Sequence, residues 1–269
     1  MKKNILLIGG YTQPNAGGFI KEFALLGGKV DAVICLQPEK NIKYWVKSLL
    51  RGLKRLRGRN LKQNLRTAFG KTIGAIPLSA VKKSWENTGE NSWNLLESSL
   101  NLFEYAKNEG IPFYHALFLS KKLLDDVTKG EPSLIMLYSG GILSEELINI
   151  PNIEFINAHM GEMPRYRGMN VLEWAVLEEQ PTKVCVMTMN KAIDGGDVIY
   201  THDISLNKEK TIRELRRTGY IECYKAMAKG IFDYSRGHCN KIAQAKGARY
   251  YYRMHPLFRA ELAKKLSNR

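Results

Sequence analysis

The chain has 269 residues, of which 44% are hydrophobic and 10% aromatic, and this composition supports a folded core and excludes a disordered or collagen-like chain. The net charge of +15 is concentrated in residues 40–83, which contain thirteen Lys or Arg residues and no Asp or Glu. No apolar run approaches the ~20 residues of a membrane span, and the apolar stretch after Met1 is too short for a signal peptide.

Strand-like and helix-like runs alternate along the first part of the chain, which predicts an α/β fold with a mostly parallel sheet flanked by helices. A glycine-rich loop is expected after the first strand, but its spacing matches neither a dinucleotide-binding fingerprint nor a phosphate-binding loop. The expected strands are 4–8, 30–36, 111–115, 133–138 and 153–156, and the expected helices are 19–26, 92–108 and 119–127.

The pattern changes after residue 156, where we expect a loop over residues 157–168. A short helix over 171–177 follows, then two strands over 183–189 and 198–206 joined by a glycine-rich turn. The remaining residues are expected to form an amphipathic helix over 211–234 and a tail that ends in a short basic helix.

Four cysteines stand far apart without a Cys-x-x-Cys pair, so we expect no zinc site. Without a secretory signal, we expect a cytoplasmic protein with reduced thiols. Cys35 and Cys185 fall in strand-like runs and are expected in the core.

Asn157 and His159 follow a predicted strand and are two residues apart, a spacing that places both side chains on one face of extended backbone. Histidine is suited to proton transfer near neutral pH, and an asparagine amide can stabilise a developing oxyanion. Asp194 and Asp197, in the glycine-rich turn, are both candidates for a carboxylate that orients the imidazole. Taken singly, a histidine near a strand end is more often a structural residue, and Asp-Gly-Gly is more often an ordinary hairpin turn.

Three pieces of sequence, in this order, resemble a known family. Asn-x-His, then Pro-x-Tyr-Arg-Gly, then Ile-Asp-Gly-Gly-Asp-Val-Ile, all between residues 133 and 206, are similar to the signature of the formyltransferases that use 10-formyltetrahydrofolate. These include glycinamide ribonucleotide, methionyl-tRNA and nucleotide-sugar N-formyltransferases. The resemblance implies a Rossmann-like formyltransferase fold with a catalytic domain over 1–206, a basic helical insertion at about 39–88, and a C-terminal helix and tail over 207–269 packed on the same domain.

The resemblance also implies the roles of individual residues. The implied catalytic residues are Asn157, His159 and Asp194, with Asp194 rather than Asp197 matching the acid of the family. The co-substrate 10-formyltetrahydrofolate is expected to bind Tyr138, Ser139, Gly140, Gly141, Ile142, Leu143, Ile193 and Gly195, without a metal. The amine substrate is expected to bind Met160, Gly161, Tyr166, Arg167, Gly168 and Trp174.

The expected acceptor is a primary amine on a small molecule, in first place an amino sugar linked to a nucleotide. Residues 207–269 leave no room for the C-terminal barrel of the methionyl-tRNA enzymes, so no nucleic acid partner is expected. Where the family has Ser-Leu-Leu-Pro, this chain has Gly161-Glu162-Met163-Pro164. This difference leaves the identity of the acceptor undecided. The alternative acceptors are a lipid- or carrier-linked amine and a glycinamide ribonucleotide-like amine. The alternative functions are hydrolysis of 10-formyltetrahydrofolate and non-catalytic binding. The sequence also leaves open whether the protein forms a homodimer.

Two further segments have more than one interpretation. Apolar residues at three- and four-residue spacing predict a basic amphipathic helix over residues 40–57. This helix either packs on the domain or contacts a partner. The partner would be the inner face of an anionic membrane, an acidic protein or a phosphorylated substrate. The tail sequence from Ala248 to Phe258 either packs its tyrosines on the core or lines a sugar or nucleotide site.

If the 40–57 helix contacts anionic lipid, the protein will float with anionic vesicles at low salt and less at moderate salt, because salt screens the attraction. Neutral vesicles serve as the control. Equal absence of binding at both salt concentrations would contradict membrane contact.

Overall fold

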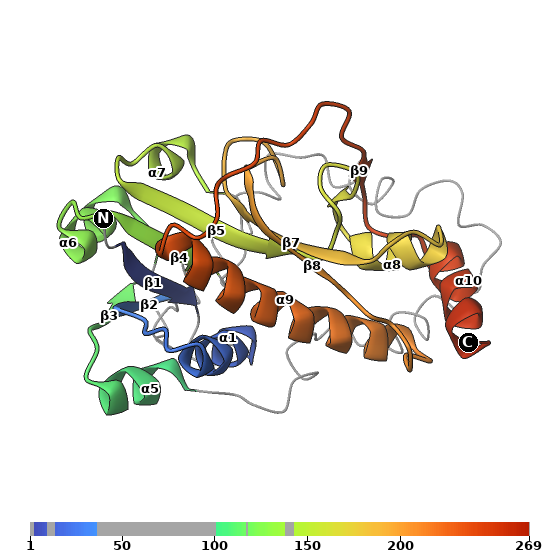
Figure 1. Cartoon of the computed structure of the whole chain (residues 1–269), viewed down its shortest axis with the longest axis horizontal. Coiled ribbons are helices and arrows are strands. Elements are labelled where there is room, and N and C mark those ends of the chain that lie inside the picture. The colour runs from blue at the N-terminus through green and yellow to red at the C-terminus, as the bar shows by residue number, and fades with distance from the viewer. Residues whose placement is uncertain (1–2, 10–13, 37–100, 117, 138–142, 269) are drawn as a thin grey trace, which may run out of the picture. The chain divides into compact units, whose positions relative to one another are not determined.

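The computed structural model describes residues 3–9, 14–36, 101–116, 118–137 and 143–268. The main element is a seven-stranded sheet with the order β3-β2-β1-β4-β5-β7-β8 (Figure 1). Its strands are β1 (Asn4–Gly9), β2 (Ala32–Leu36), β3 (Phe113–Ala116), β4 (Ser133–Leu137), β5 (Ile153–His159), β7 (Lys183–Thr188) and β8 (Val198–Asp203). A second, two-stranded sheet pairs β6 (Arg167–Gly168) with β9 (Tyr250–Tyr251). The helices are α1 (Pro14–Leu25), α5 (Leu102–Glu109), α6 (Lys121–Thr128), α7 (Glu145–Ile148), α8 (Val171–Leu177), α9 (Ile212–Ser235) and α10 (Pro256–Ser267).

The strands from β3 to β5 pair in parallel, while β7 pairs antiparallel with both β5 and β8. The predicted mostly parallel sheet flanked by helices is therefore confirmed. The predicted basic insertion lies outside the described residues, and the division of the chain at residue 206 stays a prediction.

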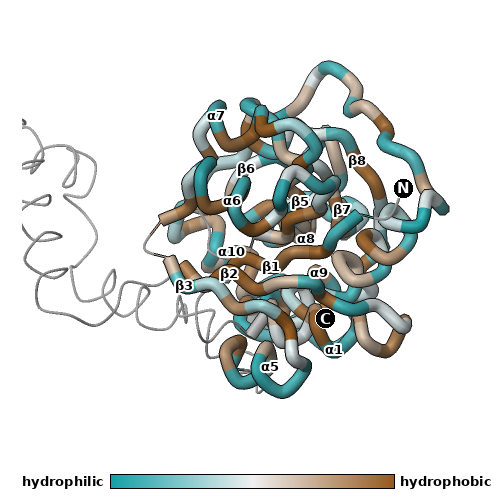
Figure 2. Tube along the Cα trace, turned by 90° about the vertical axis from the view of Figure 1, so that its left-hand side faces the viewer, coloured by the Kyte–Doolittle hydropathy of each residue, from teal (hydrophilic) through white to brown (hydrophobic). Residues whose placement is uncertain are grey.

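Residue alternation along the strands builds a core on each side of the sheet. In β1, Ile5 and Leu7 join the core beneath α1, α5 and α9, whereas Leu6 and Ile8 join the core beneath α6 and α7. Figure 2 shows the hydrophobic stretches running through the strands and the polar stretches on the outer loops. Cys35 and Cys185 are buried as predicted.

The longest helix, α9, begins at a capping box that is readable in the sequence. The Thr211 hydroxyl accepts from the Glu214 backbone N–H at 3.1 Å, and the Glu214 carboxylate accepts from the Thr211 N–H at 3.0 Å. The helix packs against α1, β7 and β8, and α10 packs against α8.

Helix α1 begins earlier than predicted and includes two glycines that were expected in the loop. Gly18 lies where α1 crosses α9, and a side chain there would collide with the ring of Tyr224. The glycine therefore allows the two helices to approach closely, which the sequence pattern does not reveal.

Strand β5 is longer than predicted and includes Asn157 and His159, which were expected in a loop. Asn157 pairs with Met187 and His159 with Cys185, so pairing with β7 keeps this segment extended. The functional residues predicted for the loop thus stand on a strand inside the sheet.

Glu154 in β5 joins segments from three distant parts of the chain. Its carboxylate accepts hydrogen bonds from Lys3 and Lys241, each at 2.7 Å, and from the Tyr234 hydroxyl at 3.0 Å. Burial raises the pKa of Glu154, but the hydrogen bonds from Lys241, Lys3 and Tyr234 and the charge of Lys3 together lower it by more, so that the pKa lies below its ordinary value.

We predict that Glu154→Gln lowers the free energy of unfolding by about 1–2 kcal/mol at neutral pH, because charge-assisted hydrogen bonds are lost. A lowered folded-state pKa stabilises the fold above the unfolded pKa, and this contribution disappears as the pH falls through the folded pKa. The difference between the two proteins should therefore shrink in acid, as measured by urea unfolding.

Asp125→Asn is the control for this prediction, because it removes the exposed pair of Lys121 and Asp125. Its effect should be about 0.5 kcal/mol or less. An equal effect of both substitutions, or no pH dependence for Glu154→Gln, would contradict the prediction.

Candidate active site

Asn157 and His159 lie on the same face of β5, toward the core formed with α6 and α7. Phe155, two residues before Asn157, faces that core, and Ile156 faces the opposite one. The alternation of side chains then directs Asn157 and His159 to one side, near the end of the strand.

The two ring nitrogens of His159 have different neighbours. Nε2 is 3.0 Å from the carbonyl oxygen of Tyr166, and Nδ1 is 3.8 Å from Oδ2 of Asp194. Because a carbonyl can only accept, Nε2 carries the hydrogen, and in the neutral ring Nδ1 keeps its lone pair. The nitrogen that can take up a proton therefore faces a carboxylate.

The His159 side chain is 11% exposed, and burial lowers the pKa of its imidazole. The negative charge of Asp194 and the hydrogen bond to Tyr166 act in the opposite direction, but the pKa stays below its ordinary value. At neutral pH the ring is neutral and available as a base.

Asp194 is held in an unusual conformation within the turn between β7 and β8. Its φ is +50°, in the left-handed region, and its Oδ2 accepts a hydrogen bond from the Gly168 N–H at 2.8 Å. The Asn190 side chain closes the turn by donating to the Gly195 carbonyl and accepting from the Ala192 N–H, both at 2.9 Å. Of the two candidate carboxylates, Asp194 is the one beside His159.

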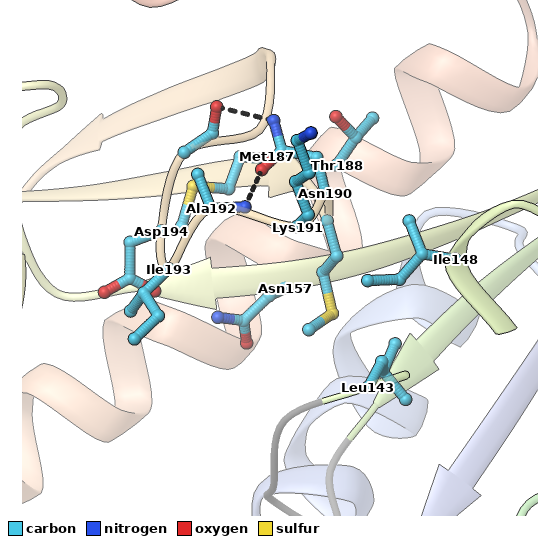
Figure 3. A pocket seen from close by; sticks show the side chains of 12 residues that line it. Leu143, Ile148, Asn157, Met187, Thr188, Asn190, Lys191, Ala192, Ile193 and Asp194 are labelled. Atoms are coloured by element: carbon cyan, nitrogen blue, oxygen red, sulfur yellow. Dashed lines mark hydrogen bonds between the residues drawn. The ribbon is translucent and has the colours of Figure 1, made fainter. Parts of the chain in front are cut away.

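A cavity of about 160 Å³ opens between this turn and the end of β5. Asn157 projects into it from β5, and Asp194 stands on the opposite wall (Figure 3). The other lining residues are Leu143, Ile148, Met187, Thr188, Met189, Asn190, Lys191, Ala192, Ile193 and Gly195. The walls are mostly apolar, with backbone groups of the turn along one side.

Three of the residues predicted to bind the formyl donor, Leu143, Ile193 and Gly195, line this cavity. The remaining predicted residues, at positions 138–142, lie outside the described residues. Binding of a donor by any of these residues stays a prediction.

The side chains of Tyr166 and Arg167 are buried against other parts of the protein, and substrate binding by these two residues stays a prediction. The Tyr166 ring is 0% exposed, stacks on Tyr251 and donates its hydroxyl to Glu178 at 2.8 Å. The Arg167 guanidinium is also buried and binds Gln244 and the Tyr250 hydroxyl. Both side chains pack the loop against the tail behind the site, because the stacking and hydrogen-bonding partners come from residues far along the chain.

The other predicted substrate residues have varied surroundings. Met160 packs beneath α9 at Gly219, and Gly161 is buried, where a Cβ would lie 2.5 Å from the Tyr166 carbonyl oxygen. Gly168 binds Asp194 through its backbone, and the Trp174 indole donates to the Tyr252 carbonyl at 3.2 Å. A contact between substrate and any of these four residues stays a prediction.

The sequence interpretation missed Glu178 and Gln244. Glu178 accepts from the hydroxyls of both Tyr166 and Tyr251, at 2.8 and 2.9 Å. Gln244 donates to the carbonyl oxygens of Asp194 and Gly196. Neither residue is part of a motif, and no local signal in the sequence could have revealed these long-range partners.

Among the described residues, no helix is sufficiently long and apolar to span a bilayer. In the same part of the chain, no group of three or more His, Cys, Asp or Glu residues is arranged to hold a metal ion.

Comparison with known proteins finds a family match for the central part of the chain. Residues 102–229 match the family model described as formyl transferase. This part of the chain is similar to the formyl transferase family. Asn157, His159 and Asp194 all lie within the matched segment.

Curated relatives also match part of the chain. A methionyl-tRNA formyltransferase of Clostridioides difficile is 31% identical over 115 residues, which is 42% of this chain and 37% of the relative. The bifunctional polymyxin resistance protein ArnA of Wigglesworthia glossinidia brevipalpis is 31% identical over 117 residues, 43% of this chain and 17% of that protein. The chain thus spans well under half the length of these relatives.

Solved structures share the fold over more of the chain. The sugar 3N-formyl transferase WlaRD, solved with dTDP and 5-N-formyl-THF, has a TM-score of 0.55 at 12% identity, covering 99% of this chain and 80% of WlaRD. The N-formyltransferase of Helicobacter canadensis, in complex with folinic acid and dTDP-3-aminofucose, has a TM-score of 0.53 at 12% identity, covering 93% and 71%. At 12% identity, these similarities show that the chain shares the fold of the two enzymes and nothing further.

We predict that Asp194→Asn lowers the pKa of His159 further, because it removes the negative charge that stabilises the imidazolium. NMR titration of the five histidines, with the His159 signal assigned from its loss in His159→Gln, measures this pKa. Asp197→Asn removes the same charge from the same turn and should leave the pKa close to wild type. A similar effect of both substitutions would contradict the pairing of His159 with Asp194.

Proposed function

We propose that the protein transfers a formyl group from 10-formyltetrahydrofolate to a primary amine on a small substrate. The observation that carries this proposal is the His159 imidazole, whose open nitrogen faces Asp194 beside the cavity that Asn157 lines. The formyl transferase family match over the segment that contains all three residues supports the same reaction.

Each of the three side chains has a chemical task in this reaction. When bound, 10-formyltetrahydrofolate supplies the formyl carbon that the amine attacks. His159 accepts at Nδ1 the proton that the attacking amine releases, and Asp194 stabilises the resulting imidazolium. The Asn157 amide donates a hydrogen bond to the formyl oxygen as negative charge develops there. His159 then returns the proton to the leaving nitrogen of the folate.

The cavity suits a flat heteroaromatic ring such as the pterin of a folate. Leu143, Ile148 and Met187 give apolar walls, and the backbone of the 190–195 turn gives hydrogen-bonding groups at one edge. Neighbours in the fold were solved with folinic acid or 5-N-formyl-THF, which supports a folate co-substrate here.

For the acceptor, we propose an amino sugar linked to a nucleotide. The folds of WlaRD and the Helicobacter canadensis enzyme support this choice, since they were solved with dTDP and dTDP-3-aminofucose. The curated methionyl-tRNA formyltransferases favour a second acceptor, a charged tRNA, although the chain covers 37% of the Clostridioides difficile relative. We also propose a cytoplasmic location. Homodimer formation and membrane contact through residues 40–57 stay predictions.

The proposal predicts that the protein and 10-formyltetrahydrofolate add one formyl group to a member of an amino-sugar nucleotide panel, as detected by mass spectrometry. Methionyl-tRNA and a reaction without any amine are run in parallel. Formate released equally without an amine would indicate a hydrolase, and formylation of methionyl-tRNA alone would overturn the sugar acceptor.

We predict that His159→Gln, Asp194→Asn and Asn157→Ala each lower kcat by about 10²–10⁴-fold, since each removes a proton-transfer or charge-stabilising group. His202→Gln is the matched control, because His202 pairs with Glu222 on α9, outside the site. Circular dichroism checks that the variants fold. Near-normal turnover in folded His159→Gln would exclude the proposed role of this residue.

A further inference from the structure

The tail that follows α9 returns to the Asp194 turn. Residues 236–249 pass from the end of α9 over the β7–β8 end of the sheet and lead into β9 (Figure 1). Ile242 exchanges two backbone hydrogen bonds with Val198, at 2.8 and 2.9 Å, at the start of β8. This bridge brings Gln244 next to the turn.

The Gln244 side chain bonds in two directions. Its Nε2 donates to the carbonyl oxygens of Asp194, at 3.0 Å, and Gly196, at 2.6 Å. Its Oε1 accepts from Nε and Nη2 of Arg167, at 3.1 and 2.6 Å. One amide group therefore ties the backbone of the turn to β6.

Arg167 is a firm anchor for this contact. The residue is 9% exposed, and its Nη1 donates to the Tyr250 hydroxyl at 3.1 Å. The next residue, Gly168, donates its N–H to the Asp194 carboxylate. Asp194 is thus held at both ends, with its carbonyl bound to Gln244 and its carboxylate bound to Gly168.

We propose that Gln244 is a positioning residue for the reaction, which sets the separation between the Asp194 carboxylate and Nδ1 of His159. This inference rests on the proposed function. Asp194 has a positive φ, so its conformation needs support from outside the turn. Nε2 of Gln244 supplies that support by binding the Asp194 carbonyl directly, and Arg167 fixes the direction from which it does so.

The effect on rate follows from the geometry. The Asp194 oxygen is 3.8 Å from Nδ1, which is beyond hydrogen-bond distance, so the stabilisation of the imidazolium depends on where the turn is held. A displacement of about 1 Å at such a position can lower kcat by up to about 100-fold.

Two substitutions distinguish the donating Nε2 of Gln244 from its accepting Oε1. Gln244→Leu removes both the donating and the accepting group. Gln244→Glu keeps an acceptor for Arg167 but cannot donate to the Asp194 and Gly196 carbonyls. Gln180→Leu is the matched control, since this half-buried glutamine donates to the Glu178 carbonyl at 3.0 Å, away from the turn.

Three readouts are measured on the full chain: kcat and KM for formyl transfer, the melting temperature, and the His159 pKa by NMR. The groups around His159 that affect its titration are Asp194 and the Tyr166 carbonyl. Cys185 stands opposite on β7, and burial raises the pKa of its thiol, so it stays neutral at neutral pH.

We expect both Gln244 variants to lower kcat about tenfold or more, with KM within about threefold of wild type. In Gln244→Leu, which adds no charge, we also expect the His159 pKa to fall toward its value in Asp194→Asn, because the Asp194 carboxylate is no longer held near the ring. Gln180→Leu should change neither quantity.

A lower melting temperature with unchanged kcat and unchanged His159 pKa would overturn the proposal, because Gln244 would then only anchor the tail. Wild-type kinetics in Gln244→Glu would also overturn it, since donation to the turn would not matter. If Gln244→Leu fails to fold, Gln244→Asn, which keeps the amide but shortens its reach, is judged by the same criteria. If wild type shows no formyl transfer, the NMR titration still decides whether Gln244 positions Asp194, and the proposed function alone fails.

Discussion

The hydrogen bond between Nε2 of His159 and the Tyr166 carbonyl is the interaction on which the arrangement of the site depends. It fixes the hydrogen on Nε2, and so determines that the nitrogen with the lone pair faces Asp194. Tyr166 can supply this carbonyl because its ring is buried against Tyr251 and its hydroxyl is bound by Glu178. A packing cluster outside the cavity thereby selects the tautomer of a histidine inside the site.

The sheet supplies the second constraint. The parallel strands end where Asn157 and His159 emerge, and β7 then pairs antiparallel with β5, which keeps both residues on a rigid strand. The turn after β7 carries Asp194 back to the same place. Rigid elements therefore hold two of the three side chains, and hydrogen bonds from β6 and the tail hold the third.

Much of the fold and part of the site could be predicted from the sequence, since strand periodicity and helix caps are local signals. The spacing of Asn157 and His159 placed them on one face, and the signature motifs selected Asp194 over Asp197. The buried position of Tyr166 and the role of Gln244 could not be predicted, because their partners lie 85 and 50 residues away in the sequence, at Tyr251 and Asp194. Long-range side-chain contacts leave no periodic trace in a single sequence.

The pairing of β6 with β9 has a consequence for how the protein is made on the ribosome. Arg167 and Gly168 find their strand partners in Tyr250 and Tyr251, which are synthesised more than eighty residues later. A nascent chain that ends within α9 therefore contains all seven strands of the central sheet but lacks the partner of β6. Assembly of this corner of the molecule is a late event in biosynthesis, and a shortened translation product would lack it.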